Sequence, residues 1–548
     1  MSATPSPRPL WAAAIDRAVG WTFGLPAETC NYTTQAVKIP LPDGTVLAAD
    51  LYRPTGHNPS GTILVRGPYG RGFALSLLSA RIFASRGYAV LFVSSRGTFG
   101  STGSFDPFRC EAQDGHGVVA WMREQPWYTG TFATLGGSYL GFTQWALLSD
   151  PPHDMVAAVI SAGPHDLAER AWGTGAFAMQ QHILWADTIA YQETRSLWAQ
   201  AWNFANPDRL DSLMNRHPLK PALVGHFGGR VPWLFHHVGQ SDIGLENWAL
   251  ARHGAALEKA DVPILLVTAW HDPFFEQTME QYEALSQRGC PVALRIGSGG
   301  HLGSQSGEST AVAFQWLERH LAGKGKVESV PPVKIWREGA DADWLELAKW
   351  PPPRNHKELF LASGGRLRAR EPSHADSASF TFDPSRPTPT VGGALLFGRG
   401  SVDDTALCSR GDVATFTTGP LPEALDIFGR PSVDIAHSSD NPFCDVFVRL
   451  SVVDAQGRSR NVTEQYRRID ASRDGKLVAL DMPDTAYRVP AGSRVRLVVA
   501  GGCFPKYGVN LGTGKDPATG TVLRPARHTI RFGGDYGSCL VVPVLKKS

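Results

Sequence analysis

Several features that would indicate particular classes of protein are missing from this 548-residue sequence. It contains no run of 18 consecutive apolar residues, so we expect no membrane span. Its 53 Lys and Arg residues nearly balance 51 Asp and Glu residues, so the chain has no excess charge for holding nucleic acid. No internal repeat and no low-complexity tract is present.

Cysteine is scarce, and no secretory signal is recognisable at the N-terminus. The seven cysteines form no C-x-x-C pair, which gives zinc binding no support. Their odd number favours reduced thiols, with a bridge between two C-terminal cysteines as the alternative. Residues 1–9 contain prolines where a signal peptide has Lys or Arg, and Asp16 and Arg17 interrupt the apolar stretch that follows. We therefore expect a cytoplasmic protein.

The first 32 residues form a predicted helical extension. Trp11, Ile15, Val19 and Phe23 recur at helical spacing. This spacing favours an amphipathic helix that packs on the body of the protein, and attachment to a membrane surface is the alternative.

What is present is the composition of a large globular protein. Hydrophobic residues make up 43% of the chain and charged residues 19%, and the length suggests three or four domains. The 57 Gly and 40 Pro residues indicate many turns.

Residues 33–166 have the pattern of an α/β domain. Short runs that are apolar throughout, such as TILV at 62–65 and YAVLFVS at 88–94, alternate with helical stretches. Continuous apolar strands between helices predict a doubly wound, mostly parallel sheet buried on both faces. The same alternation resumes at residues 258–335, so we expect one domain in two parts.

The two remaining segments have other patterns. Residues 167–257 lack strand patterns and are rich in Trp, which predicts an inserted helical cap. Residues 336–548 consist of short alternating stretches between turn residues, which predicts a β jelly-roll domain.

The most informative segment is the strand that leads into Gly136-Gly137-Ser138-Tyr139-Leu140-Gly141. A strand, a Gly-x-Ser turn and an apolar helix in succession are typical of a nucleophile elbow, which exposes the serine hydroxyl at the top of a sheet. The usual pattern is G-x-S-x-G, whereas here the last glycine comes one place later, at 141. An ordinary serine in a glycine-rich loop is the alternative.

A serine nucleophile needs a base and an orienting carboxylate, each on a loop after a later strand. Asp272 follows the apolar strand at 263–269, and His301 follows the strand at 292–296 through a glycine-rich loop. We predict a triad of Ser138, Asp272 and His301. Rival positions near strand ends are Asp166, His153, His165 and His271.

The oxyanion of an acyl-transfer intermediate requires two donors. The backbone N–H of Tyr139, directly after the serine, is the first. The second should come from the loop after an early strand, Arg66-Gly67-Pro68-Tyr69-Gly70, where the hydroxyl of Tyr69 can donate. Packing alone is the other interpretation of Tyr69.

Together these motifs resemble the cocaine esterase and X-Pro dipeptidyl-peptidase-like α/β-hydrolases, over roughly residues 33–545. The displaced glycine matches the G-x-S-Y-x-G elbow of that family, and Arg66-x-Pro-Tyr69 matches its oxyanion loop. The further matching segments are Ser95–Gly103, Glu111-x-x-Asp114 with Trp121, Trp270-His271-Asp272, Gly300-His301 and Phe504–Tyr507.

The resemblance implies an α/β-hydrolase fold with a helical cap and a C-terminal jelly roll that helps to close the site. By position, it implies an apolar acyl pocket lined by Trp172, Trp185, Phe274, Leu396 and Phe397. Related α-amino-acid ester hydrolases carry carboxylates just after the catalytic Asp, whereas this chain has Phe274 and Phe275 there. An apolar acyl group therefore fits better than a free amine.

We therefore expect a serine hydrolase that cleaves esters, or amides, through an acyl-enzyme, without a metal or organic cofactor. The expected partner is a small acyl ester or amide, with a homodimer as the assembly to test. An X-Pro dipeptidyl-peptidase or aminopeptidase-type hydrolase is the alternative enzyme. A carbohydrate-binding jelly-roll protein on an inactive scaffold is the alternative outside enzymes.

Overall fold

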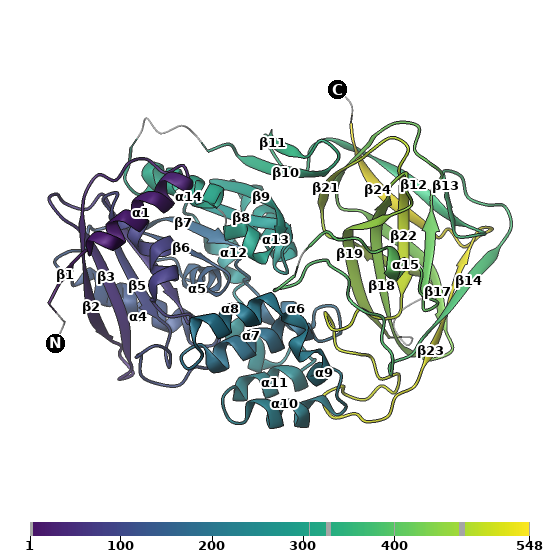
Figure 1. The fold of residues 1–548 in the computed structure, drawn as a ribbon, viewed down its shortest axis with the longest axis horizontal. Coiled ribbons are helices and arrows are strands. Elements are labelled where there is room, and N and C mark those ends of the chain that lie inside the picture. Colours follow the sequence, from purple (N-terminus) through teal and green to yellow (C-terminus); the bar gives the residue numbers. More distant parts are fainter. Residues whose placement is uncertain (1–3, 306, 325–329, 399, 471–476, 547–548) are drawn as a thin grey trace.

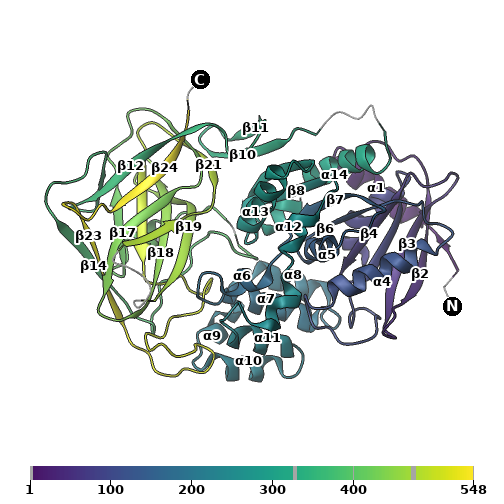
Figure 2. The same cartoon turned by 180° about the vertical axis from the view of Figure 1, so that it is seen from behind.

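The computed structural model describes residues 4–305, 307–324, 330–398, 400–470 and 477–546. An α/β domain lies at one end of an elongated molecule and a domain of β-strands at the other (Figure 1). A group of helices lies against the junction of these two domains, and the view from behind shows the same arrangement (Figure 2).

The sheet of the α/β domain has the strand order β2–β3–β5–β4–β6–β7–β8–β9. Neighbours from β5 to β9 are parallel, whereas β2, β3 and β5 pair antiparallel. Every residue of β4, β5 and β8 is buried, as expected for apolar strands covered on both faces. The strands are β1 (Ser6–Pro7), β2 (Tyr32–Pro40), β3 (Val46–Pro54), β4 (Thr62–Gly67), β5 (Ala89–Ser94), β6 (Phe132–Gly137), β7 (Met155–Ser161), β8 (Ile264–His271) and β9 (Val292–Gly300).

Helices cover both faces of this sheet, and each face has its own apolar core. The first face is covered by α1 (Leu10–Thr22), α2 (Phe73–Ser76), η1 (Leu77–Arg81), α3 (Ile82–Ala84) and α14 (Gly307–His320). The opposite face is covered by α4 (Glu111–Arg123), α5 (Tyr139–Leu148), α12 (Ala255–Lys259) and α13 (Phe275–Gln287). The doubly wound α/β fold predicted from the sequence is confirmed.

The N-terminal helix α1 forms as predicted, but with a different buried face. Ile15, Val19 and Phe23 pack partly buried, whereas Trp11 is 58% exposed. The buried centre of the contact is polar, because Asp16 pairs with Arg8 at 2.7 Å and with Arg81 at 2.5 Å. A carboxylate can be buried at low cost only when it is paired. Trp11 lies at the edge of this contact, where it stacks on Phe73 with ring centroids 5.7 Å apart.

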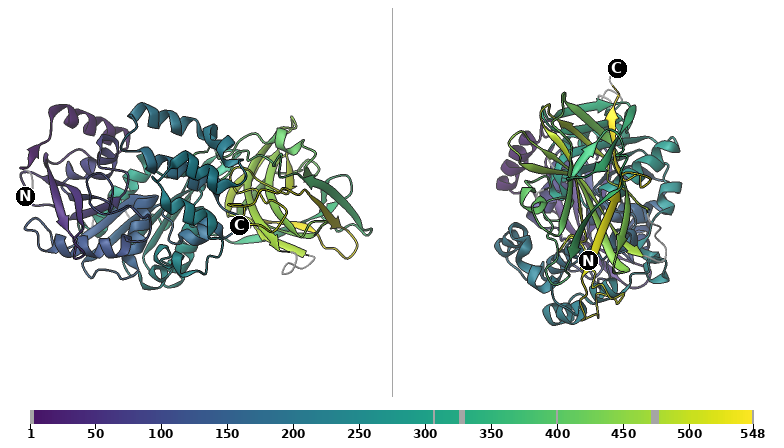
Figure 3. Two further views of the ribbon diagram at one scale, coloured as in Figure 1. Left: turned by 90° about the horizontal axis from the view of Figure 1, so that it is seen from below. Right: turned by 90° about the vertical axis from the view of Figure 1, so that its right-hand side faces the viewer.

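Residues 167–251 form the helical insertion at the carboxyl ends of the strands. Its apolar core includes Tyr139 and Phe142 of α5 and Leu396 of the strand domain. The cap thus packs against both other domains (Figures 1 and 3). Its helices are α6 (Leu167–Trp172), α7 (Met179–Tyr191), α8 (Leu197–Ala205), η2 (Pro207–Leu210), α9 (Asp211–Met214), α10 (Leu219–Phe227), α11 (Pro232–Gly239) and η3 (Glu246–Ala251).

The strand β10 (Val333–Gly339) connects the two large domains. It pairs with β9 of the hydrolase sheet and, at its end, with β21 of the strand domain. The expected domain boundary at residue 335 falls inside this strand. The hairpin partner of β10 is β11 (Asp343–Leu347).

The C-terminal domain is the jelly roll that the sequence predicted, with its strands around one apolar core. β18 pairs with β19 and β22, whereas β17 pairs with β20, β23 and β24. Its elements are β12 (Arg354–Ala362), β13 (Arg366–Arg368), β14 (Asp376–Phe382), α15 (Thr405–Cys408), β15 (Val413–Thr417), β16 (Leu425–Gly429), β17 (Ser432–Ser439), β18 (Phe443–Val453), β19 (Ser459–Asp470), β20 (Leu477–Asp481), β21 (Thr485–Val489), β22 (Arg494–Ala500), β23 (Ala526–Phe532) and β24 (Cys539–Leu545).

Two observations bear on the expected surroundings of the protein. No helix among the described residues is both long and apolar enough to cross a bilayer. None of the seven cysteines, all of which lie in the described ranges, is joined in a disulfide.

Candidate active site

Ser138 occupies the turn between β6 and α5. Its backbone has φ 59° and ψ −124°, a conformation that costs energy for any residue with a side chain. The N–H of Ser138 is held by the carbonyl of Ser161, and its own carbonyl accepts the N–H groups of Gly141 and Phe142. Strand and helix therefore fix the strained turn from both sides, as in a nucleophile elbow.

The position of the last glycine has a steric reason. A Cβ at Gly141 would lie 2.6 Å from the Cα of Gly163, which follows β7, so α5 can approach β7 this closely only with glycine there. Leu140 occupies the usual glycine position, and a Cβ at Gly136 or Gly67 would lie 2.4 Å from its side chain. The positions of these glycines are thus explained by how closely α5 packs against the strands of the sheet.

Asp272 and His301 lie at the carboxyl ends of the adjacent strands β8 and β9. Nδ1 of His301 is 2.7 Å from Oδ2 of Asp272, and both side chains are almost completely buried. Oδ1 of Asp272 accepts the backbone N–H of Phe274 at 2.6 Å. With Nδ1 bound to the carboxylate, Nε2 is the ring nitrogen available to a hydroxyl group.

The rival residues have other partners. Asp166 caps the N-terminus of α6 through Glu169 N and pairs with Arg252 at 2.8 Å. His165 contacts the amide of Gln281. The two others are likewise engaged: His271 with Glu338, and His153 with Arg123.

Tyr69 lies beside the elbow, in the turn after β4. Burial raises the pKa of Tyr69, while hydrogen bonds with Trp185, Ser138 and the backbone N–H of Tyr139 act in the opposite direction. The distance from Nε1 of Trp185 to the Tyr69 hydroxyl is 3.1 Å. The phenol therefore keeps its proton at neutral pH and lies next to both the serine hydroxyl and the amide that follows it.

The side chain of Tyr139 is anchored by a buried carboxylate. Its hydroxyl donates to Glu111 at 2.8 Å and accepts the backbone N–H of Phe108 at 2.9 Å. Glu111 in turn pairs with Arg66 at 2.8 Å and accepts the Ser95 hydroxyl at 3.0 Å. Arg66, Ser95 and Glu111, which come from three separate sequence motifs, therefore act together: they fix the ring of Tyr139 and the start of α5.

A small, partly open cavity lies beside Ser138. Of the five predicted pocket residues, Trp185, Phe274 and Leu396 line it. The side chains that line the cavity are Tyr69, Phe108, Ser138, Tyr139, Pro164, Leu167, Gln181, His182, Trp185, Phe274 and Leu396.

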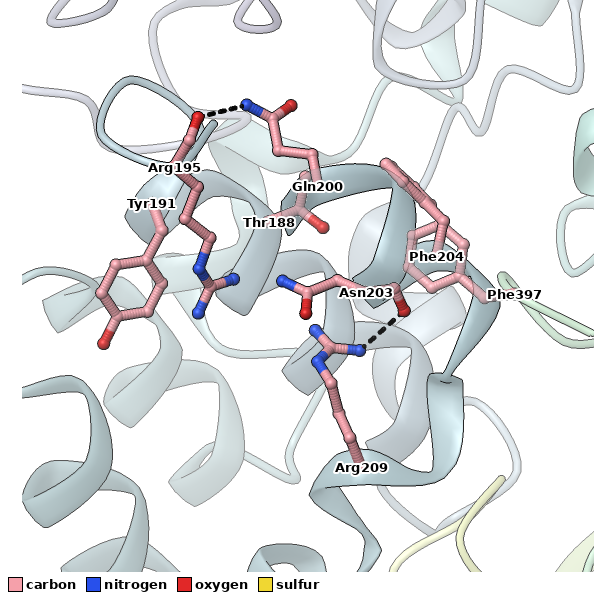
Figure 4. A pocket seen from close by; sticks show the side chains of 8 residues that line it. All are labelled: Thr188, Tyr191, Arg195, Gln200, Asn203, Phe204, Arg209 and Phe397. Carbon is pink, nitrogen blue, oxygen red and sulfur yellow. Dashed lines mark hydrogen bonds between the residues drawn. The ribbon is translucent and has the colours of Figure 1, made fainter. Parts of the chain in front are cut away.

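The structure places Trp172 and Phe397 outside this wall. Trp172 packs on Phe177 in the cap, and its Nε1 donates to the carbonyl of His237 at 2.8 Å. Phe397 contacts Phe204 of α8, with ring centroids 4.8 Å apart. Figure 4 shows these two phenyl rings together beside Asn203 and Arg209, in a separate small pocket.

Polar residues of the wall were not found from the sequence. Gln181 and His182 lie on the buried helix α7, and Trp185 follows His182 by one turn. No motif marks the two polar residues. The i, i+3 spacing from His182 to Trp185 was the one available signal, because such residues share a helix face.

One side-chain cluster in the described part of the chain has the spacing of metal ligands. The donor atoms of His437, Cys444 and His528 lie within 4.8 Å of one another, buried in the jelly roll. Nε2 of His437 is 3.0 Å from Nδ1 of His528, which is an ordinary hydrogen-bond distance. The hydrogen bond between the two imidazoles accounts for their short distance.

Comparison with known families agrees with the geometry of the elbow. The family model described as X-Pro dipeptidyl-peptidase (S15 family) matches residues 43–303. The model described as X-Pro dipeptidyl-peptidase C-terminal non-catalytic domain matches residues 325–541. The two matches together span the α/β domain, the cap and the jelly roll.

Individual relatives extend over nearly the whole chain. Cocaine esterase of Rhodococcus sp. (strain MB1 Bresler) is 27% identical over 578 residues, covering 94% of this chain and 99% of the relative. Two solved structures share the fold with a TM-score of 0.80, each covering 95% of this chain and 98% of its own. They are an aminopeptidase from a marine sediment archaeon, Thaumarchaeota archaeon, at 18% identity, and an α-amino acid ester hydrolase at 20%.

The family matches, the long relative and the fold all agree. The alternative of a carbohydrate-binding protein on an inactive scaffold is not supported, because these relatives are hydrolases. The chain is therefore a serine hydrolase with the α/β-hydrolase fold, similar over nearly its whole length to the cocaine esterase and X-Pro dipeptidyl-peptidase-like hydrolases.

Proposed function

We propose that this enzyme hydrolyses esters of small apolar acids, with Ser138 as nucleophile, His301 as base and Asp272 as the residue that orients the base. The observation that carries the proposal is the buried His301–Asp272 pair, 2.7 Å apart, together with the cavity that Ser138 shares with Tyr69 and Tyr139. Nucleophile, oxyanion donors and oriented base are the parts that acyl transfer requires.

In the first half-reaction, Oγ of Ser138 attacks the ester carbonyl carbon and its proton passes to Nε2 of His301. The carbonyl oxygen becomes an oxyanion, which accepts hydrogen bonds from the Tyr139 N–H and the Tyr69 O–H. The tetrahedral intermediate collapses, the C–O bond to the alcohol breaks, and His301 returns the proton to the leaving oxygen. Water, activated by the same imidazole, then hydrolyses the acyl-enzyme.

The cavity supports an acyl group without charge. Among the described residues that line it, none is Asp or Glu, and Phe274 lies directly after the Asp272 loop. A cationic amine would lose its hydration here with no carboxylate to pair with. This favours esters over the X-Pro dipeptidyl-peptidase alternative, whose substrates carry a free N-terminus.

Two assays test the proposal. A fluorophosphonate probe should label the wild-type enzyme and leave Ser138→Ala unlabelled, since the variant lacks the nucleophile. In parallel, the enzyme should hydrolyse nitrophenyl acyl esters much faster than a Gly-Pro anilide. Turnover of the anilide above that of the esters would favour the peptidase, and persistent labelling of Ser138→Ala would remove Ser138 from the role.

We also propose a reducing location, the cytoplasm, and a small-molecule substrate as the enzyme's partner. The cysteines without disulfides and the nearly balanced charge support this view. Sedimentation of the purified protein, with and without a reducing agent, tests whether the chain is a monomer or a homodimer and whether thiols join copies.

A further inference from the structure

His182 adds a polar group to the wall of the Ser138 cavity. It lies on α7, is 3% exposed, and its Nδ1 is 2.8 Å from the carbonyl oxygen of Ala178, one turn earlier. A carbonyl oxygen only accepts hydrogen bonds, so Nδ1 carries the proton. Nε2, on the opposite side of the ring, is then an acceptor.

The ring is neutral under ordinary conditions. Burial lowers the pKa of His182 to about 4, and the positive charge of Arg170 acts in the same direction. The hydrogen bond with Ala178 favours the charged form but is outweighed. Nε2 therefore holds a lone pair throughout the pH range in which a serine hydrolase works.

This acceptor has no partner among the residues that the structure describes. Nε2 of His182 is buried and makes no hydrogen bond, while the ring packs beside Phe177 at a centroid distance of 4.9 Å. Because Nδ1 is turned back to the helix backbone, the edge with Nε2 is the one that faces away from α7. Buried polar groups are almost always hydrogen-bonded, so an unpaired acceptor on a residue of the cavity wall indicates a ligand that supplies the donor.

The charge of the cavity limits which donor can bind. The neighbouring Gln181 has its oxygen engaged by Arg170 at 2.8 Å, and no carboxylate lines the wall in the described residues. An ammonium group would be stripped of water without a counter-charge. The donor is therefore neutral, namely a hydroxyl or an amide N–H.

The helix also sets where this donor lies. Trp185, three residues after His182 on α7, contacts the Tyr69 hydroxyl beside Ser138. Three residues correspond to about 4.5 Å along a helix axis. Because Trp185 and not His182 is the α7 residue that contacts Tyr69, the donor is a substituent on the acyl group and not part of the ester itself. Benzoyl esters substituted at the 3 or 4 position place a donor at two such points.

We propose that His182 determines specificity by accepting a hydrogen bond from a neutral hydroxyl or amide N–H on the acyl group of the substrate. This inference rests on the proposed ester hydrolysis at Ser138. The enzyme would accordingly favour esters of hydroxylated or amide-bearing acids over esters of plain hydrocarbon acids of the same size.

Matched substrates test this preference. The 4-nitrophenyl esters of 3- and 4-(hydroxymethyl)benzoic acid are compared with those of 3- and 4-ethylbenzoic acid, with kcat/KM divided by the rate of alkaline hydrolysis of each ester. For at least one position, the wild-type enzyme should favour the hydroxymethyl ester by about tenfold or more, because the ethyl group leaves Nε2 unpaired.

Two variants separate the hydrogen bond from packing. His182→Phe keeps an aromatic ring without an acceptor, so the ratio of kcat/KM for the hydroxymethyl and ethyl esters should fall to about one. His217→Phe is the matched control, since both ring nitrogens of His217 are also buried without a partner but this cap residue does not line the cavity. It should keep the wild-type preference.

Equal normalised rates for hydroxymethyl and ethyl esters at both positions in the wild-type enzyme would overturn the proposal, and so would a preference that survives in His182→Phe. The wild-type comparison decides the matter even if His182→Phe does not fold. Failure of the underlying function looks different: the ethyl esters would not be hydrolysed at all, or Ser138→Ala would hydrolyse them as well as the wild type.

Discussion

The indole N–H of Trp185 donates a hydrogen bond to the hydroxyl oxygen of Tyr69 at 3.1 Å. This contact joins helix α7 of the cap to the turn after β4 of the α/β domain. A hydroxyl that accepts one bond still has its own proton to donate, and the accepted bond fixes the direction in which that proton points. The cap therefore orients a group beside Ser138 in addition to supplying walls.

Tyr69→Phe removes only this hydroxyl. If it stabilises the oxyanion, kcat should fall by roughly 10²–10³ with little change in KM, because the ground-state carbonyl is a weaker acceptor than the oxyanion. Steady-state kinetics and a thermal melt check this, and the melting temperature should change little. Tyr128→Phe, whose hydroxyl donates to Asp154 instead, is the control and should retain full activity. A near-normal kcat in Tyr69→Phe would leave a second backbone amide to take the role.

Asp272→Asn should lower kcat by about 10⁴, because an amide in place of the carboxylate favours the wrong tautomer of His301. Asp166→Asn is the matched comparison: it lies at the end of another strand but caps α6 and pairs with Arg252. Its kcat should stay close to that of the wild type. Equal losses in the two variants would leave the orienting acid unassigned.

Truncation after Lys349 should not yield a stable, active hydrolase domain. Trp350, Phe428 and Ala486 belong to the same apolar core as the sheet of the α/β domain, and Leu396 lines the cavity. Removal of the jelly roll would expose this core and promote aggregation. Size-exclusion chromatography and an ester assay provide the test, and a monomeric fragment with full kcat would contradict the prediction.

Glu464 predicts a pH-dependent contribution to stability. Burial alone would raise its pKa, but Arg449 and Lys506, the latter at 2.7 Å, outweigh burial and lower the pKa to about 2. The folded-state pKa lies below that of an ordinary Glu, near 4.3, so the stabilisation is complete above that pH and is lost as the pH falls toward 2.

Glu464→Gln, which leaves two buried cations short of a charge partner, should reduce the unfolding free energy at pH 7 by about 3–5 kcal/mol. The difference from the wild type should shrink when urea unfolding is repeated near pH 3. A difference that stays constant between these pH values would show that the charge of Glu464 is not what stabilises the fold.

The sequence allows prediction of those features that depend on strands. Asp272 and His301 follow two apolar runs, and neighbouring parallel strands bring their carboxyl ends to one edge, so their proximity could be expected. The direction of the Trp172 and Phe397 side chains could not be predicted, because they lie on a cap helix and a long loop and are oriented by tertiary packing. Trp172 bonds to a carbonyl inside the cap, and Phe397 turns to Phe204.

The reach of one jelly-roll loop into the cavity has a consequence for biosynthesis. The elbow at Ser138 and the pair at 272 and 301 are complete once the first 305 residues have been made, yet Leu396, which lines the cavity, is added about 90 residues later. A nascent chain on the ribosome therefore carries the proposed catalytic groups before it has the complete cavity wall. Only after the final domain has been synthesised does the chain have both the proposed catalytic groups and the full cavity that selects the substrate.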